Sequence, residues 1–65
     1  MNIDLSYLSA EALQDLLRKN RVDCSRLDSA ILDGRGTAET MRQASTCHIV
    51  IRAIEDELSK REAQR

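Results

Sequence analysis

Mostly apolar residues recur along this chain at alternating steps of three and four, in two long runs. The first run is Ala10, Leu13, Leu17, Asn20, Cys24, Leu27 and Ile31, and the second is Thr40, Ala44, Cys47, Ile51, Ile54, Leu58 and Arg61. This spacing places each run as a stripe along one side of an α-helix, as in a coiled coil. The sequence therefore predicts two amphipathic helices of similar length.

The two stripes match each other if the chain folds back between them, at a segment that contains Gly34 and Gly36. The opposed residues are then Leu13 and Leu58, Leu17 and Ile54, Asn20 and Ile51, Cys24 and Cys47, Leu27 and Ala44, and Ile31 and Thr40, and the residue numbers of each pair sum to 71. This register predicts an all-α fold, an antiparallel two-helix hairpin resembling a coiled coil. Because 65 residues without Trp or Phe make a thin core, we expect two hairpins to dimerise into a four-helix bundle.

The length predicts one domain over 1–65. Capping signals divide it into an arm at 1–8, a first helix at 9–33, a turn at 34–37 and a second helix at 38–62. Ser9 and Thr37 are suitable N-caps, and Gly34 suits the left-handed position after a helix. A break near 20–24 is an alternative, with the first helix ending at Asn20, because Asn, Asp and Ser there compete for backbone hydrogen bonds. Asn20 is thus interpreted either as a polar seam residue that fixes the register or as a helix end.

The residues beside the stripes differ between the two sides of the predicted hairpin. One side, the apolar flank, consists of Leu16, Asp23, Ala30, Gln43, Val50 and Glu57, and the other, the polar flank, of Gln14, Arg21, Asp28, Met41, His48 and Glu55. Leu16 and Val50, with Ile49 and Val22 behind them, widen the stripe on one side only. We expect this side to close on a partner, through Leu5, Tyr7, Leu16, Ile49 and Val50, although the arm is an alternative cover for it.

This one-sided surplus predicts a non-enzymatic protein-interaction module, such as a regulator, inhibitor or co-chaperone. In length and architecture the chain resembles small bacterial helical-hairpin regulators and type III secretion co-chaperones. The alternative is a Rop-like hairpin that binds RNA or DNA through Arg18, Lys19, Arg21 and Arg26. A net charge of -1 with both signs interspersed favours the first hypothesis, since phosphate binding needs clustered cations.

The sequence predicts no catalytic residue, no cofactor and no metal. His48 and Cys47 are adjacent on a helix and point about 100° apart. Neither cysteine lies in a CxxC pair, and a single histidine is not expected to complete a zinc site. Cys24 and Cys47 are expected to be reduced core residues rather than a disulfide. The acidic run 55–57 is interpreted as a solvated face, and no apolar run is long enough for a membrane. We therefore expect a soluble cytoplasmic protein.

Overall fold

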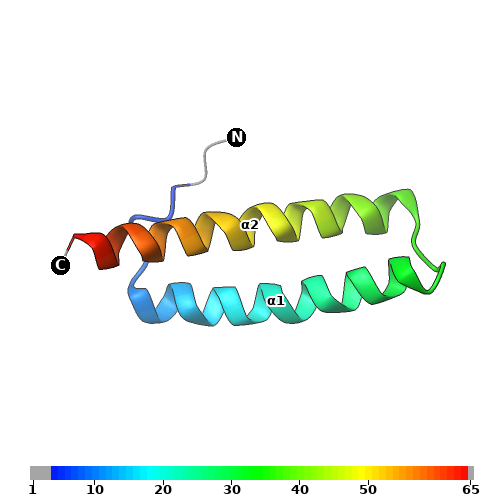
Figure 1. Cartoon of the computed structure of the whole chain (residues 1–65), viewed down its shortest axis with the longest axis horizontal. Helices are drawn as coiled ribbons and strands as arrows, with labels where there is room; N and C mark the ends of the chain where they lie inside the picture. Colours follow the sequence, from blue (N-terminus) through cyan, green and yellow to red (C-terminus); the bar gives the residue numbers. More distant parts are fainter. Residues whose placement is uncertain (1–3, 65) are drawn as a thin grey trace.

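The computed structural model describes residues 4–64, and within them the chain forms two α-helices, α1 (Ala10–Leu32) and α2 (Ala38–Ala63). The helices lie side by side and run in opposite directions, joined by a short turn (Figure 1). No strand occurs anywhere in this part of the chain. The prediction of an all-α helical hairpin is confirmed.

Both helices begin at the residues whose side chains suit an N-cap. The Ser9 hydroxyl accepts a hydrogen bond from the Ala12 N–H at 3.1 Å, and the Thr37 hydroxyl accepts one from the Thr40 N–H at 3.1 Å. Each bond satisfies a backbone donor that lacks a partner within the helix. Glu11 and Glu39 lie in the first turns, where the helix dipole favours negative charge.

The turn is closed by backbone hydrogen bonds that require a left-handed residue. The Gly34 N–H donates to the Ile31 carbonyl at 3.1 Å and the Arg35 N–H donates to the Ala30 carbonyl at 2.9 Å, which together form a Schellman motif. Gly34 has a φ of 76°, in the left-handed region, which is energetically unfavourable for any residue that has a Cβ. Gly36 passes close to α1, since a Cβ there would lie 3.0 Å from Ile31 Cγ1.

α1 runs without a break through the segment that contains Asn20. The Asn20 amide donates to the Leu16 carbonyl of the preceding turn at 2.8 Å, so its polar group is satisfied within its own helix. The structure therefore contains the unbroken helix and not the alternative with an end near 20–24.

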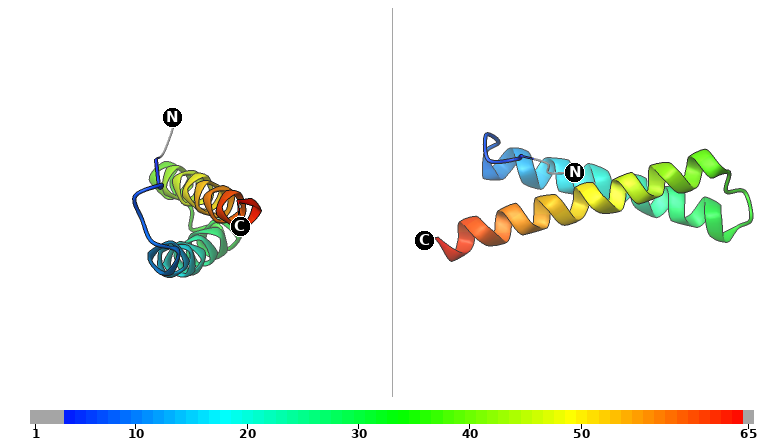
Figure 2. Two further views of the ribbon diagram at one scale, coloured as in Figure 1. Left: turned by 90° about the vertical axis from the view of Figure 1, so that its left-hand side faces the viewer. Right: turned by 90° about the horizontal axis from the view of Figure 1, so that it is seen from above.

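The largest buried side chains lie in the half of the hairpin away from the turn. Leu13 and Ile54 are fully buried, and Leu17 and Leu58 pack against them, as the predicted register requires. Towards the turn the buried residues are smaller, namely Cys24 and Ala44. Seen from above, the helices cross rather than lie parallel, and the arm spans from the start of α1 to α2 on one side (Figure 2). The core is thus concentrated at the open end.

The positive φ at the turn gives the first testable prediction. Gly34→Ala should lower the free energy of unfolding by about 1 kcal/mol, because alanine is strained in the left-handed region. Gly34→Asn should cost clearly less, since asparagine tolerates this conformation. Urea unfolding followed by helical circular dichroism measures both variants. An alanine variant as stable as the parent chain would contradict this account of the turn.

Candidate functional site

The apolar flank is covered at the open end of the hairpin by the arm. Leu5 is buried and belongs to the same cluster as Leu13 and Ile54, with Leu16 and Val50 packed against it. The arm thus covers the surplus apolar surface that the sequence placed on this side. Leu5 can cover this surface only if the arm is held against the helices.

Polar contacts hold the arm in place. Arg61 of α2 donates to the Leu5 carbonyl at 3.3 Å and to the Ser6 carbonyl at 3.2 Å, and its Nε donates to Glu57 at 2.9 Å. Asp4 accepts hydrogen bonds from the Ser6 N–H at 3.0 Å and the Ser6 hydroxyl at 2.6 Å. Both hydrogen bonds stabilise the carboxylate and so lower the pKa of Asp4, the one from the Ser6 hydroxyl more than the one from the Ser6 N–H. Residues 4–8 of the arm therefore form a folded turn bonded to α2, and residues 1–3 lie outside the described part of the chain.

The structure brings together three of the five residues expected to contact a partner. Leu5, Leu16 and Val50 lie in one cluster, but Leu5 is buried within the chain itself and the other two are half-buried. Tyr7 is 77% exposed and Ile49 is 58% exposed. Ile49 lies midway between two seam residues of α2, at 47 and 51, so its side chain points away from the seam and not behind Val50. Tyr7 and Ile49 therefore do not extend the Leu5 cluster.

The half of the apolar flank nearer the turn is not covered by the arm. It contains a groove of about 530 Å³ between the helices, which we call the turn groove. Its lining consists of Asp23, Arg26, Leu27, Glu39, Arg42, Gln43, Thr46 and Cys47. Leu27 and Cys47 are seam residues and half-buried, whereas the other six are exposed. The groove thus has an apolar floor and a polar, charged rim.

The four cations of the nucleic-acid hypothesis are divided among different surfaces. Arg18 pairs with Asp15 on α1, and Arg21 pairs with Glu55 across the polar flank at 3.2 Å. Lys19 lies beside Arg18 on the outside of α1, in a hollow that also includes Asp23, and Arg26 lines the turn groove. Two of the charges are thus balanced by carboxylates, and the set does not form one basic surface of the kind that phosphate binding requires.

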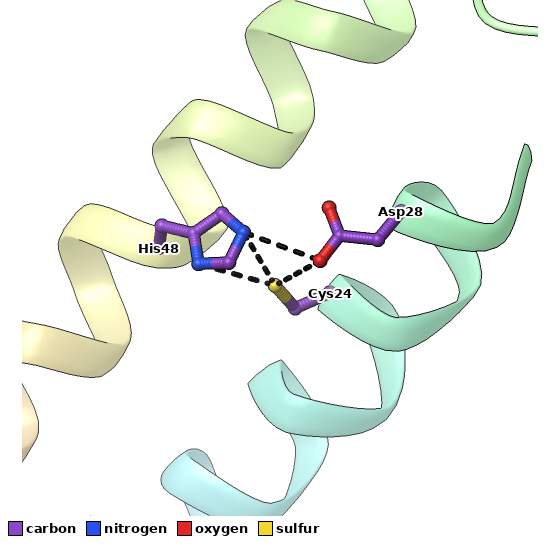
Figure 3. A group of neighbouring side chains, drawn as sticks. All are labelled: Cys24, Asp28 and His48. Carbon is purple, nitrogen blue, oxygen red and sulfur yellow. Dashed lines mark hydrogen bonds and ion pairs between the residues drawn. The ribbon is translucent and has the colours of Figure 1, made fainter. Parts of the chain in front are cut away.

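A second cluster of side chains lies on the polar flank, where Cys24 and Asp28 of α1 meet His48 of α2 (Figure 3). The Cys24 sulfur is 3.1 Å from His48 Nε2 and 3.4 Å from Nδ1. Asp28 Oδ2 is 3.3 Å from His48 Nε2 and accepts a long hydrogen bond from the Cys24 thiol at 3.6 Å. Cys24 is buried, whereas the His48 side chain is 59% exposed.

The electrostatics of this cluster keep the thiol protonated at neutral pH. Burial raises the pKa of the Cys24 thiol, and the nearby Asp28 carboxylate raises it further. A cysteine nucleophile needs the opposite, a pKa lowered by a cation or a helix N-terminus. Cys24 and Cys47 are both free thiols, as expected. The cluster is built to hold donor atoms together rather than to activate the sulfur.

Sequence reasoning missed this cluster because it compared His48 with its neighbour Cys47 and not with residues of α1. Two signals were present. Cys24 and Asp28 are four residues apart and so share a face of α1. The numbers of Asp28 and His48 sum to 76, as do those of the ion pair Arg21 and Glu55, so both pairs bridge the polar flank at equivalent positions.

Comparisons of this chain with protein-family models, with curated proteins and with solved structures find no match. Neither α1 nor α2 is long and apolar enough to cross a membrane.

The docked arm generates a stability prediction. Leu5→Ala should lower the free energy of unfolding by about 2 kcal/mol, because it removes a buried side chain from the cluster. Tyr7→Ala, two residues away and largely exposed, should change it by less than about 0.5 kcal/mol. Thermal and urea unfolding compare the two variants. Equal effects of the two substitutions would show that Leu5 is not docked in solution.

The two cysteines should differ in reactivity. In Cys47→Ala, the remaining Cys24 thiol should be alkylated by iodoacetamide at least tenfold more slowly than Cys47 is in Cys24→Ala, because its raised pKa leaves less thiolate and its side chain is buried. The difference should narrow as the pH rises towards the pKa of Cys24, and it should vanish in urea. Mass spectrometry of timed samples gives the rates, and a Cys24 thiol that reacts as fast folded as unfolded would contradict the structure.

Proposed function

We propose that this chain is a non-enzymatic protein-interaction module, of the regulator or co-chaperone kind, whose first partner is a second copy of itself. The contact surface in this proposal is the turn groove, and the product is a four-helix bundle. The observation that carries the proposal is the groove itself, an uncovered apolar floor between two helices on the flank that the arm closes elsewhere.

The accessible surface supports association. The chain exposes 5152 Å². A compact monomer of 7.3 kDa exposes about 4,200 Å² by the usual scaling with mass. The excess of roughly 1,000 Å² is similar to the area of about 800 Å² that each partner buries in an interface of standard size. The excess arises because the hairpin is one layer of helices, with each helix covered on a single side.

The charges on the rim favour a second copy over an unrelated partner. Asp23 and Glu39 are acidic and Arg26 and Arg42 are basic, and none of the four forms an ion pair within residues 4–64. A two-fold interface brings the same patch of both subunits together, so a patch with equal numbers of both signs can pair with itself. An unrelated partner of one charge sign would find no such complement here.

A substitution at the rim tests the proposal. Thr46→Arg places a long cation in the groove and should weaken dimerisation at least tenfold, a loss of about 1.4 kcal/mol. Ser45→Arg is the matched control, because Ser45 is the exposed neighbour outside the groove and gains the same charge. Sedimentation equilibrium and native mass spectrometry over a range of concentrations measure the association, with circular dichroism to verify the fold.

Two results would overturn the proposal. One is a parent chain that stays monomeric at every concentration reached, and the other is a Thr46→Arg variant that dimerises as well as the Ser45→Arg control. Binding of RNA or DNA that weakens steeply with added salt would instead support the Rop-like hypothesis.

A further inference from the structure

We infer that Cys24, Asp28 and His48 form a zinc-binding site that ties α1 to α2, with water in the fourth coordination position. The site lies on the polar flank and uses no residue of the turn groove, so it does not depend on the proposed self-association. Its donors are a thiol, a carboxylate and an imidazole, which are the three ligand types that zinc takes in proteins.

The spacing of the donor atoms matches a tetrahedral zinc ion. Zinc bonds of about 2.3 Å to sulfur and about 2.0–2.2 Å to nitrogen and oxygen set the donors roughly 3.3–3.6 Å apart. The distances in the hairpin are 3.1 Å from Cys24 Sγ to His48 Nε2, 3.6 Å from Cys24 Sγ to Asp28 Oδ2, and 3.3 Å from His48 Nε2 to Asp28 Oδ2. Two of these distances fall within that range, and the third, from Cys24 Sγ to His48 Nε2, is shorter than it. The three donors therefore lie close to three corners of the required tetrahedron.

The backbone fixes where each donor originates. Cys24 and Asp28 are one helical turn apart on the same face of α1, and both face the side of α2 that carries His48 (Figure 3). One donor comes from a different helix, so a bound ion would join the two helices at a layer where the seam residues are small. Because ligands from two helices come together only in the folded chain, binding of the ion would stabilise the fold.

Coordination requires one rearrangement of the histidine. The sulfur lies at similar distances from both ring nitrogens, so it faces the ring between them and not along either lone pair. The imidazole therefore has to rotate about its side-chain bonds to aim Nε2 at the ion. The His48 side chain is exposed on the outer side, so this turn displaces no core residue.

The surroundings leave room for the fourth ligand. The cluster opens into a shallow hollow of about 530 Å³ whose lining includes Ser25, Ser29 and Leu32. Arg21 is the one cation in this lining, and its guanidinium is paired with Glu55 at 3.2 Å. A site with three protein ligands and an open fourth position is the arrangement found in zinc sites that hold a water molecule.

Binding is a proton-coupled exchange without redox chemistry. The Cys24 thiol loses one proton to solvent as the sulfur–zinc bond forms, and the neutral imidazole donates its lone pair. The charge of the Zn²⁺ ion is then balanced by one thiolate and one carboxylate. The donor set also excludes the hard ions, because Ca²⁺ and Mg²⁺ are held by oxygen ligands, whereas thiolate and imidazole favour zinc.

Metal titration of the reduced full-length chain tests the inference. Zinc should bind at one ion per chain, raise the melting temperature and slow the alkylation of Cys24. Cobalt(II) should give a sulfur-to-cobalt charge-transfer band with visible bands of tetrahedral intensity. Cys47→Ala is the matched control, since it removes the other thiol and should retain every one of these effects.

The ligand variants should lose the site to different degrees. Cys24→Ala should abolish the charge-transfer band, and His48→Gln should weaken zinc at least a hundredfold, with the fold kept because His48 is exposed. Asp28→Asn should weaken it at least tenfold. The inference is overturned if the parent chain takes up no zinc, if one ion binds per two chains, or if His48→Gln binds zinc as tightly as Cys47→Ala does.

Discussion

The volume of the side chains along the seam determines which half of this hairpin holds the hydrophobic core and which half holds the turn groove. At the open end the opposed residues are large, and near the turn each layer contains a small residue; the layers in this order are Leu13 with Leu58, Leu17 with Ile54, Cys24 with Cys47, and Leu27 with Ala44. Large residues fill the space between the crossing helices and exclude water. Small residues cannot do so, and the turn groove lies in that half. The hydrophobic core thus lies where the seam side chains are large, and the candidate contact surface lies where they are small.

The parts of the fold that depend on neighbours in sequence, or on a period that repeats along the whole chain, were predictable, and the parts that depend on single contacts between distant residues were not. Ser9, Thr37 and Gly34 act within one helical turn of their own positions, so residue type alone identified both caps and the left-handed turn residue. The pairing of Leu17 with Ile54 followed from a period that repeats along the whole chain. Asn20 was ambiguous because its amide suits either a helix end or a bond to the preceding carbonyl, and its surroundings favoured the bond.

The arm and the metal-ligand cluster could not be located in this way. Leu5 has no periodic context, and its position is fixed by Arg61, which is 56 residues away. The sequence offered the arm as an alternative cover for the apolar flank without a means of choosing it. His48 was assigned to the polar flank, but the reach of its side chain to Cys24 depends on how the two helices pack, because the two residues belong to different helices. Side-chain reach of this kind is a property of the packed pair and not of either helix alone.

The two candidate sites of the hairpin lie on different flanks. On the apolar flank, the arm covers the half away from the turn, and the half near the turn contains the uncovered turn groove. On the polar flank, Arg21 with Glu55 and Asp28 with His48 bridge the helices with exposed charges, which contribute little to stability in water. Zinc bound by Asp28, His48 and Cys24 would replace the weak Asp28–His48 ion pair with stronger metal–ligand bonds. These bonds would lie at a layer where the seam side chains are small. Because the turn groove and the Cys24–Asp28–His48 cluster lie on opposite flanks, a metal bound at the cluster would leave the groove open. The proposed self-association and the proposed metal binding can therefore be tested separately.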